Sequence, residues 1–120
     1  MHKVTRIEEC ERTPARKSVD KINLVDSKTG AKNLDVHIMV LKPGGSTNLH
    51  HHSTSESVWI VLQGTAQARI EGNEYRLEKN SVIFVPPNVD HEFKAIGEED
   101  YIFIEIFAPP AADHVPAKHP

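Results

Sequence analysis

The residues best suited to chemistry in this sequence are histidines. The chain has 120 residues and eight histidines, three of which are consecutive, at positions 50–52. In an extended strand, side chains two positions apart project from the same face, so His50 and His52 converge while His51 points away. Neutral imidazole is a good ligand for zinc, iron, nickel, copper and manganese. The spacing therefore predicts one part of a metal site, which needs further ligands from elsewhere in the chain.

Two other side chains could complete such a site. His91 follows the rigid turn PPNVD and begins an expected strand, a position that can hold its ring over the mouth of a barrel. Glu56 lies shortly after the histidine triplet and would supply a carboxylate oxygen. Three imidazoles and one carboxylate leave coordination positions open for water, substrate or dioxygen. We therefore expect a divalent metal ion (Fe, Mn, Ni, Zn or Cu) to be bound by His50, His52, Glu56 and His91.

Glu105 is a candidate catalytic residue. Alternation in the segment 101–107 places it on the same face as two phenylalanines. A carboxylate on an aromatic face lies either at a barrel mouth or buried with a perturbed pKa, and is then a candidate general base. The alternative is an exposed residue of an edge strand. His37 lies between apolar neighbours in another expected strand, and we expect it to be structural or to line a pocket rather than to bind metal.

Short alternating segments with turn residues between them must position these side chains. We expect strands at residues 21–25, 34–41, 57–62, 65–70, 75–77, 82–85, 91–95 and 101–107. This pattern favours an all-β fold, an antiparallel barrel or sandwich, because no helical stripe of useful length occurs. We expect one domain over residues 1–120, with an N-terminal arm or edge strand (1–20), a barrel core (34–107) and a proline-rich surface tail (108–120).

The histidine segment and the proline turn resemble the two motifs of the cupin family. The residues that match the first motif are Gly44, His50, His52, Glu56 and Gly64, and those that match the second are Asn80, Pro86, Asn88 and His91. Asparagine replaces the family's glycine at both places in the second motif, a mild change because asparagine tolerates left-handed backbone. The resemblance covers about residues 34–107. It implies a double-stranded β-helix (jelly roll), usually a dimer, that holds a divalent metal through the matching histidines and glutamate.

One residue more than in the family motif separates Glu56 from Gly64. If the strand is regular, Ser57 faces the site and Glu56 points outward. If a β-bulge absorbs the extra residue, Glu56 points inward. A site of three histidines alone would still suit iron, nickel or copper.

Composition limits the partners. The net charge of -3 and pI of about 6.2 argue against a phosphate-backbone partner, so we expect no nucleic-acid binding. No apolar run approaches the roughly 20 residues that cross a bilayer, so we expect no membrane association. The single cysteine, Cys10, cannot form an internal disulfide, which fits a cytoplasmic protein.

The resemblance implies a metal-dependent enzyme of the dioxygenase, isomerase or lyase type that acts on a small polar metabolite, such as a sugar derivative or an organic acid. The segment 50–66 is also similar to the barrel domain of type II mannose-6-phosphate isomerases and mannose-1-phosphate guanylyltransferases. The alternative is a non-catalytic cupin module that binds a small molecule. We expect a homodimer, because strands such as 21–25 could pair across subunits.

Overall fold

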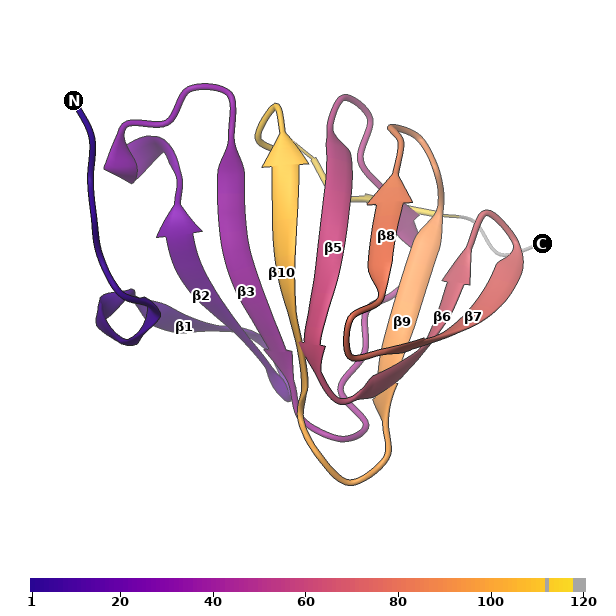
Figure 1. Cartoon of the computed structure of the whole chain (residues 1–120). Helices are drawn as coiled ribbons and strands as arrows, with labels where there is room; N and C mark the ends of the chain where they lie inside the picture. Colours follow the sequence, from indigo (N-terminus) through magenta and orange to yellow (C-terminus); the bar gives the residue numbers. More distant parts are fainter. Residues whose placement is uncertain (112, 118–120) are drawn as a thin grey trace.

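Two antiparallel sheets contain nearly all of the regular secondary structure of the described residues (Figure 1). The computed structural model describes residues 1–111 and 113–117. Within them, two short 3-10 turns, η1 (Ile7–Glu9) and η2 (Ser27–Thr29), lack the length and apolar character of a membrane-spanning helix. The strands are β1 (Arg12–Arg16), β2 (Val19–Val25), β3 (Asp35–Leu41), β4 (His50–His51), β5 (Glu56–Gln63), β6 (Thr65–Ile70), β7 (Asn73–Glu78), β8 (Val82–Val85), β9 (His91–Ile96), β10 (Tyr101–Ala108) and β11 (Val115–Pro116).

The order of the strands is that of a jelly roll. The six-stranded sheet has the order β1-β2-β3-β10-β5-β8, and the five-stranded sheet has the order β11-β4-β9-β6-β7. Strand β10, near the end of the chain, therefore lies between β3 and β5 (Figure 1). Every strand pairing among the described residues is antiparallel. The expectation of an all-β antiparallel jelly roll is confirmed.

An aromatic core fills the space between the sheets. In β10 every second side chain is buried, beginning at Tyr101, because successive side chains of a strand point to opposite faces of the sheet. The ring of Phe103 lies 5.9 Å from the ring of Trp59 in β5 and 5.2 Å from that of Phe93 in β9. The Trp59 ring is in turn 5.2 Å from the ring of His91. The core thus packs directly against one of the expected metal ligands.

Turns with left-handed backbone set the spacing of the strands. Gly64 has a φ of 80°, and a Cβ atom there would lie 2.4 Å from the carbonyl oxygen of Asp100, so only glycine fits. Asn80 and Asn88 also have positive φ values, of 74° and 65°. Asparagine therefore adopts the left-handed conformation at the two places where the cupin pattern has glycine. These two turns lead into β8 and β9.

Two expectations about the elements need correction. Residues 21–25 lie within β2, which pairs with β3 and, at Lys21 and Ile22, also with β1, so the first part of this segment is not an edge that could pair across subunits. Residues 112 and 118–120 of the expected surface tail (108–120) lie outside the described residues, and the described part of it contains a strand. Its strand β11 pairs with β4 at the edge of the five-stranded sheet, beside the histidine triplet.

Candidate metal centre

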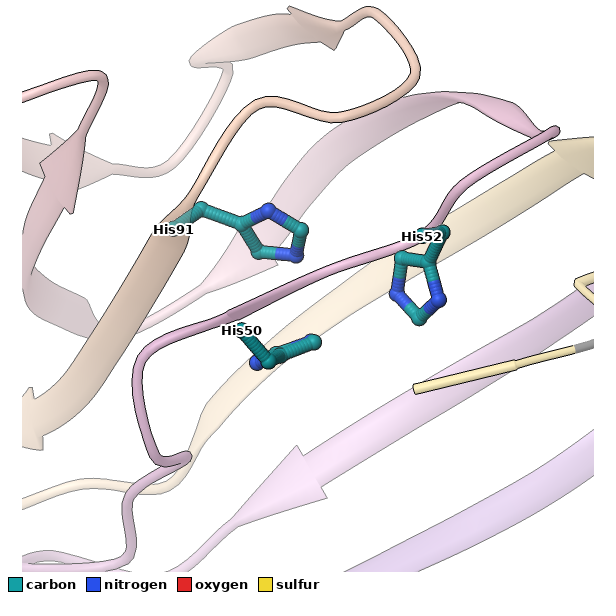
Figure 2. A group of neighbouring side chains, drawn as sticks. All are labelled: His50, His52 and His91. Atoms are coloured by element: carbon teal, nitrogen blue, oxygen red, sulfur yellow. The ribbon is translucent and has the colours of Figure 1, made fainter. Parts of the chain in front are cut away.

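Two neighbouring strands bring the three histidines together. β4 pairs with β9 so that His50 lies directly opposite His91, and His52 follows on the same side of the extended segment. Figure 2 shows the three rings directed toward a shared space. Each ring can offer a nitrogen atom within 4.8 Å of the other two, and all three residues are buried. This is the arrangement that the spacing of His50 and His52 and the position of His91 predicted.

Backbone carbonyl groups orient all three imidazole rings. Each Nδ1 atom faces a carbonyl oxygen: that of Asn48 at 2.7 Å for His50, Val89 at 2.9 Å for His91, and Asp113 at 2.5 Å for His52. Because a carbonyl oxygen only accepts hydrogen bonds, each Nδ1 carries the proton and donates it. The neutral ring then leaves the lone pair of Nε2 free, which is the arrangement typical of metal-binding histidine.

Burial keeps these imidazoles in the form that binds metal. Removal from water lowers the pKa of His50 to about 3, although its hydrogen bond to the Asn48 carbonyl acts in the opposite direction. The neighbouring histidine rings lower it further. Burial also lowers the pKa of His91. Since metal binding requires deprotonated ligands, protons compete weakly with a cation for these two rings.

The expected fourth ligand, Glu56, does not join the histidines. The side chains of β5 alternate regularly from Glu56 to Val61, and this leaves Glu56 exposed and Ser57 buried. The extra residue of the motif is absorbed further along, because the pairing of β5 with β10 shifts register at Leu62, which forms a β-bulge. The bulge lies beyond the site, so it cannot turn the carboxylate inward.

Glu105 lies in the sheet that faces the histidines, and its side chain points to the interior. It is 9% exposed, and its Oε1 atom is 2.7 Å from Nε2 of His37, its partner in β3. The other ring nitrogen of His37, Nδ1, is 3.2 Å from Oδ1 of Asp35. Glu105 is therefore buried in β10, which lies between β3 and β5, and is not an exposed residue of an edge strand. His37 lines the same cavity, as expected.

The cavity between the sheets has a volume of about 210 Å³. Its lining includes His50, His52, Glu105 and the two cations Arg16 and Lys21. Larger hollows lie elsewhere, one of about 340 Å³ beside Arg69 and one of about 590 Å³ beside Gly64, but none of the histidines lines them. The chemistry of the lining, rather than volume, identifies the site.

Sequence reasoning missed the contribution of the C-terminal segment. The ring of His114 stacks on that of His50, with centroids 3.7 Å apart and planes 8° from parallel. Its Nε2 atom is 3.1 Å from Oδ1 of Asn48. The carboxylate of Asp113 accepts hydrogen bonds from the backbone N–H and the hydroxyl of Ser53. A proline-rich segment without alternation carries no signal for such contacts; only its histidine content could have drawn attention.

The family of the chain follows from its match to known proteins. Residues 37–107, more than half of the chain, match the cupin domain family. The chain belongs to the cupin family. This match begins at His37 and ends at Phe107, so it contains the three clustered histidines and Glu105 but not the C-terminal segment.

The names of proteins that are similar to this chain indicate different activities. A mannose-1-phosphate guanylyltransferase of Klebsiella pneumoniae is 31% identical over 74 residues, which are 60% of this chain and 15% of that protein. The polyketide synthase CurC of Streptomyces cyaneus is 22% identical over 122 residues, 98% of this chain and 79% of that protein. The structure of the polyketide cyclase RemF from Streptomyces resistomycificus has a TM-score of 0.85 at 20% identity, covering 100% of this chain and 88% of RemF.

The coverage limits what these proteins share with this cupin. The chain spans a small part of the guanylyltransferase and most of CurC and RemF. The likeness to RemF shows the fold. A divalent transition metal fits the site on chemical grounds, because three buried imidazoles present nitrogen atoms to one point.

Proposed function

We propose that this cupin is a metal-dependent enzyme that transfers a proton on a small polar metabolite bound between its two sheets. The observation that carries the proposal is the cluster of His50, His52 and His91. Two members of this cluster, His50 and His52, line a cavity whose opposite wall holds Glu105. A bound divalent metal ion would polarise a carbonyl or enolate oxygen of the substrate. The proton transfer itself would then fall to the protein.

Glu105 is the group that we assign to this proton transfer. Its carboxylate lies in the cavity wall, and a carboxylate within hydrogen-bond reach of a substrate can act as general base and general acid. His37 holds Glu105 in place through the contact of 2.7 Å, and Asp35 holds His37 through the contact of 3.2 Å. His37 and Asp35 are therefore positioning residues, and Glu105 is the proposed catalytic residue.

The cavity favours a small, negatively charged or oxygen-rich substrate. Its volume of about 210 Å³ is below the roughly 300–1,000 Å³ of drug-sized pockets. Arg16 and Lys21 line it, and their charges complement a carboxylate or phosphate group. The names of the similar proteins add sugar phosphates and polyketides to the candidates. We propose an organic acid or a sugar derivative with a carbonyl group.

The test is exchange of carbon-bound hydrogen in deuterated water, followed by NMR. Wild-type protein loaded with each candidate metal should catalyse exchange next to the carbonyl group in at least one of a panel of keto acids, sugar phosphates and 1,3-diketones. Glu105→Gln should retain metal and lose exchange by about 10²–10⁴-fold. Metal-loaded protein that retains a ligand but catalyses neither exchange nor oxygen uptake would overturn the enzyme and support the non-catalytic module.

We infer in addition that the protein is a cytoplasmic homodimer. Among the described residues, the edge strands β1 and β8 of the six-stranded sheet each pair with a strand on one side only, and Val82 and Phe84 of β8 are 69% and 58% exposed. Pairing or packing between copies would cover such an edge. The single Cys10 suits a reducing compartment. Light scattering after gel filtration should give twice the mass of 13.4 kDa; a monomer would contradict the dimer.

A further inference from the structure

The segment 113–117 is attached to the histidine loop along its whole length. At one end, the carboxylate of Asp113 accepts hydrogen bonds from the backbone N–H and the hydroxyl of Ser53. At the other end, the N–H of Ala117 donates to the carbonyl of Leu49 at 2.9 Å. Between them, β11 pairs with β4. The segment is thus anchored on both sides of the position at which it meets the metal centre.

The carbonyl groups that orient the three imidazoles come from different parts of the chain. His50 and His91 each donate to a carbonyl two residues earlier in the chain, so their orientation is local. His52 instead donates to the carbonyl of Asp113, 61 residues later. The histidine motif by itself therefore cannot set the tautomer of His52. That depends on whether segment 113–117 is in place.

We propose that segment 113–117 helps to form the metal centre, and that Asp113 is the positioning residue for His52. This inference rests on the proposed metal site. The Asp113 carbonyl selects the tautomer of His52 in which the proton is on Nδ1, so that Nε2 offers its lone pair to the metal. The two hydrogen bonds of the Asp113 carboxylate to Ser53 keep that carbonyl within reach of the ring. His114 stacks on a second ligand ring, that of His50, and lines the same cavity.

Substitution of the anchor should weaken metal binding while the fold is retained. Asp113→Ala removes both acceptors for Ser53, and loss of an outer partner of a ligating histidine lowers metal affinity by about 10–100-fold. Asp113→Asn keeps an oxygen for the Ser53 N–H and should restore most of that affinity. Glu56→Gln is the matched control, because Glu56 is an exposed carboxylate close to the same loop, and it should bind metal like the wild type.

Two spectroscopic measurements separate positioning from a general loss of structure. Titration with Co²⁺ gives the affinity and a visible spectrum that reports the nitrogen ligands, and Asp113→Ala should change both. In the metal-free protein, ¹⁵N NMR at about pH 8.5, where free imidazole is neutral, should show His52 protonated on Nδ1 in the wild type. Asp113→Ala should shift His52 toward the other tautomer while His50 and His91 stay unchanged.

The outcomes distinguish this inference from the proposed function. Absence of Co²⁺ binding by the wild type overturns the metal site itself, and with it the inference. Equal affinity and an unchanged His52 tautomer in wild type and Asp113→Ala overturn the inference alone. If Asp113→Ala does not fold, as judged by circular dichroism, Ala117→Pro tests the same claim, because it removes the N–H that donates to Leu49. Its affinity should fall by the same range, and wild-type affinity would contradict the inference.

Discussion

The backbone carbonyls around the three histidines give each ring its orientation. A histidine two positions from another on an extended segment can point to the same place, but the spacing does not decide which nitrogen carries the proton. In this cupin the carbonyls of Asn48 and Val89 decide it for His50 and His91. The result is a set of buried, neutral donors, which is what a divalent cation requires.

Replacement of a ligand should remove the metal and preserve the fold. His50→Ala and His91→Ala each delete one of three imidazoles, and the two that remain bind a cation weakly. We expect each variant to lose most of the metal measured by elemental analysis, with a circular dichroism spectrum like that of the wild type. His51→Ala is the control, because His51 is paired with Asp90 outside the cluster. Undiminished metal in both ligand variants would contradict the site.

Acidification should lower the free energy of unfolding of the metal-free protein, because His50 is buried in its neutral form. The pKa of His50 is about 3 in the folded chain, whereas the ordinary value is 6.5. Between these values the unfolded chain binds more protons than the folded chain, so the free energy of unfolding rises with pH there and falls on acidification below 6.5. At about pH 5.5, one unit below that value, the burial of neutral His50 lowers the free energy of unfolding by about 1 kcal/mol.

Urea denaturation of the metal-free protein at pH 7.5 and at about pH 5.5 measures this effect. The His50→Gln variant is the control, since glutamine does not titrate, and its loss of stability over the same range should be smaller. A wild-type free energy of unfolding that is equal at the two pH values would show that His50 is not held neutral by the fold.

Strand pairing accounts for what the sequence could and could not reveal about the site. Alternation within strands predicted the shared direction of His50 and His52. It placed Glu105 on the same face as two phenylalanines but left open whether that face is buried or exposed. It could not decide between Glu56 and Ser57, because the extra residue of the motif could be absorbed before or after them. Only the register between β5 and β10 places the bulge at Leu62. Contacts of the C-terminal segment were equally invisible, since they follow from long-range pairing of β11 with β4.

The turn between β5 and β6 should tolerate no side chain. Gly64→Ala adds the cost of left-handed backbone, about 1–2 kcal/mol, and a clash with the carbonyl of Asp100. Gly72→Ala is a matched control, because Gly72 has the same φ of 80° and no atom within 4 Å of its Cβ position. Chemical denaturation should show a larger loss of stability for Gly64→Ala. Equal losses would mean that the strands move apart without cost.

The jelly roll as a whole places different chemistry on its two sheets. The clustered histidines belong to the five-stranded sheet and the segment that follows β4, whereas Glu105 and His37 belong to the six-stranded sheet. The cavity lies between the two groups, so closure of the sheets on each other assembles the site. The fold was predictable from alternation and from the two cupin motifs. This division between the sheets was not, because it depends on which distant strands become neighbours.

Metal should therefore stabilise the whole molecule rather than a single loop. The ligands from β4, from the segment that follows it and from β9 come together only in the folded chain, so a cation binds that state preferentially. At a free metal concentration of about 100 times Kd the stabilisation is about 2.7 kcal/mol. Calorimetry should show a lower Tm after chelation and recovery on addition of metal. A Tm that does not respond to metal would argue against the site.

The central claim is that the three histidines bind one cation together. X-ray absorption at the edge of the bound metal tests it most directly, because the outer scattering of imidazole rings counts histidine ligands. We predict a spectrum of three imidazoles for the wild type and of two for His91→Ala reconstituted at high metal concentration. A wild-type spectrum without imidazole scattering, or one unchanged in His91→Ala, would contradict the account.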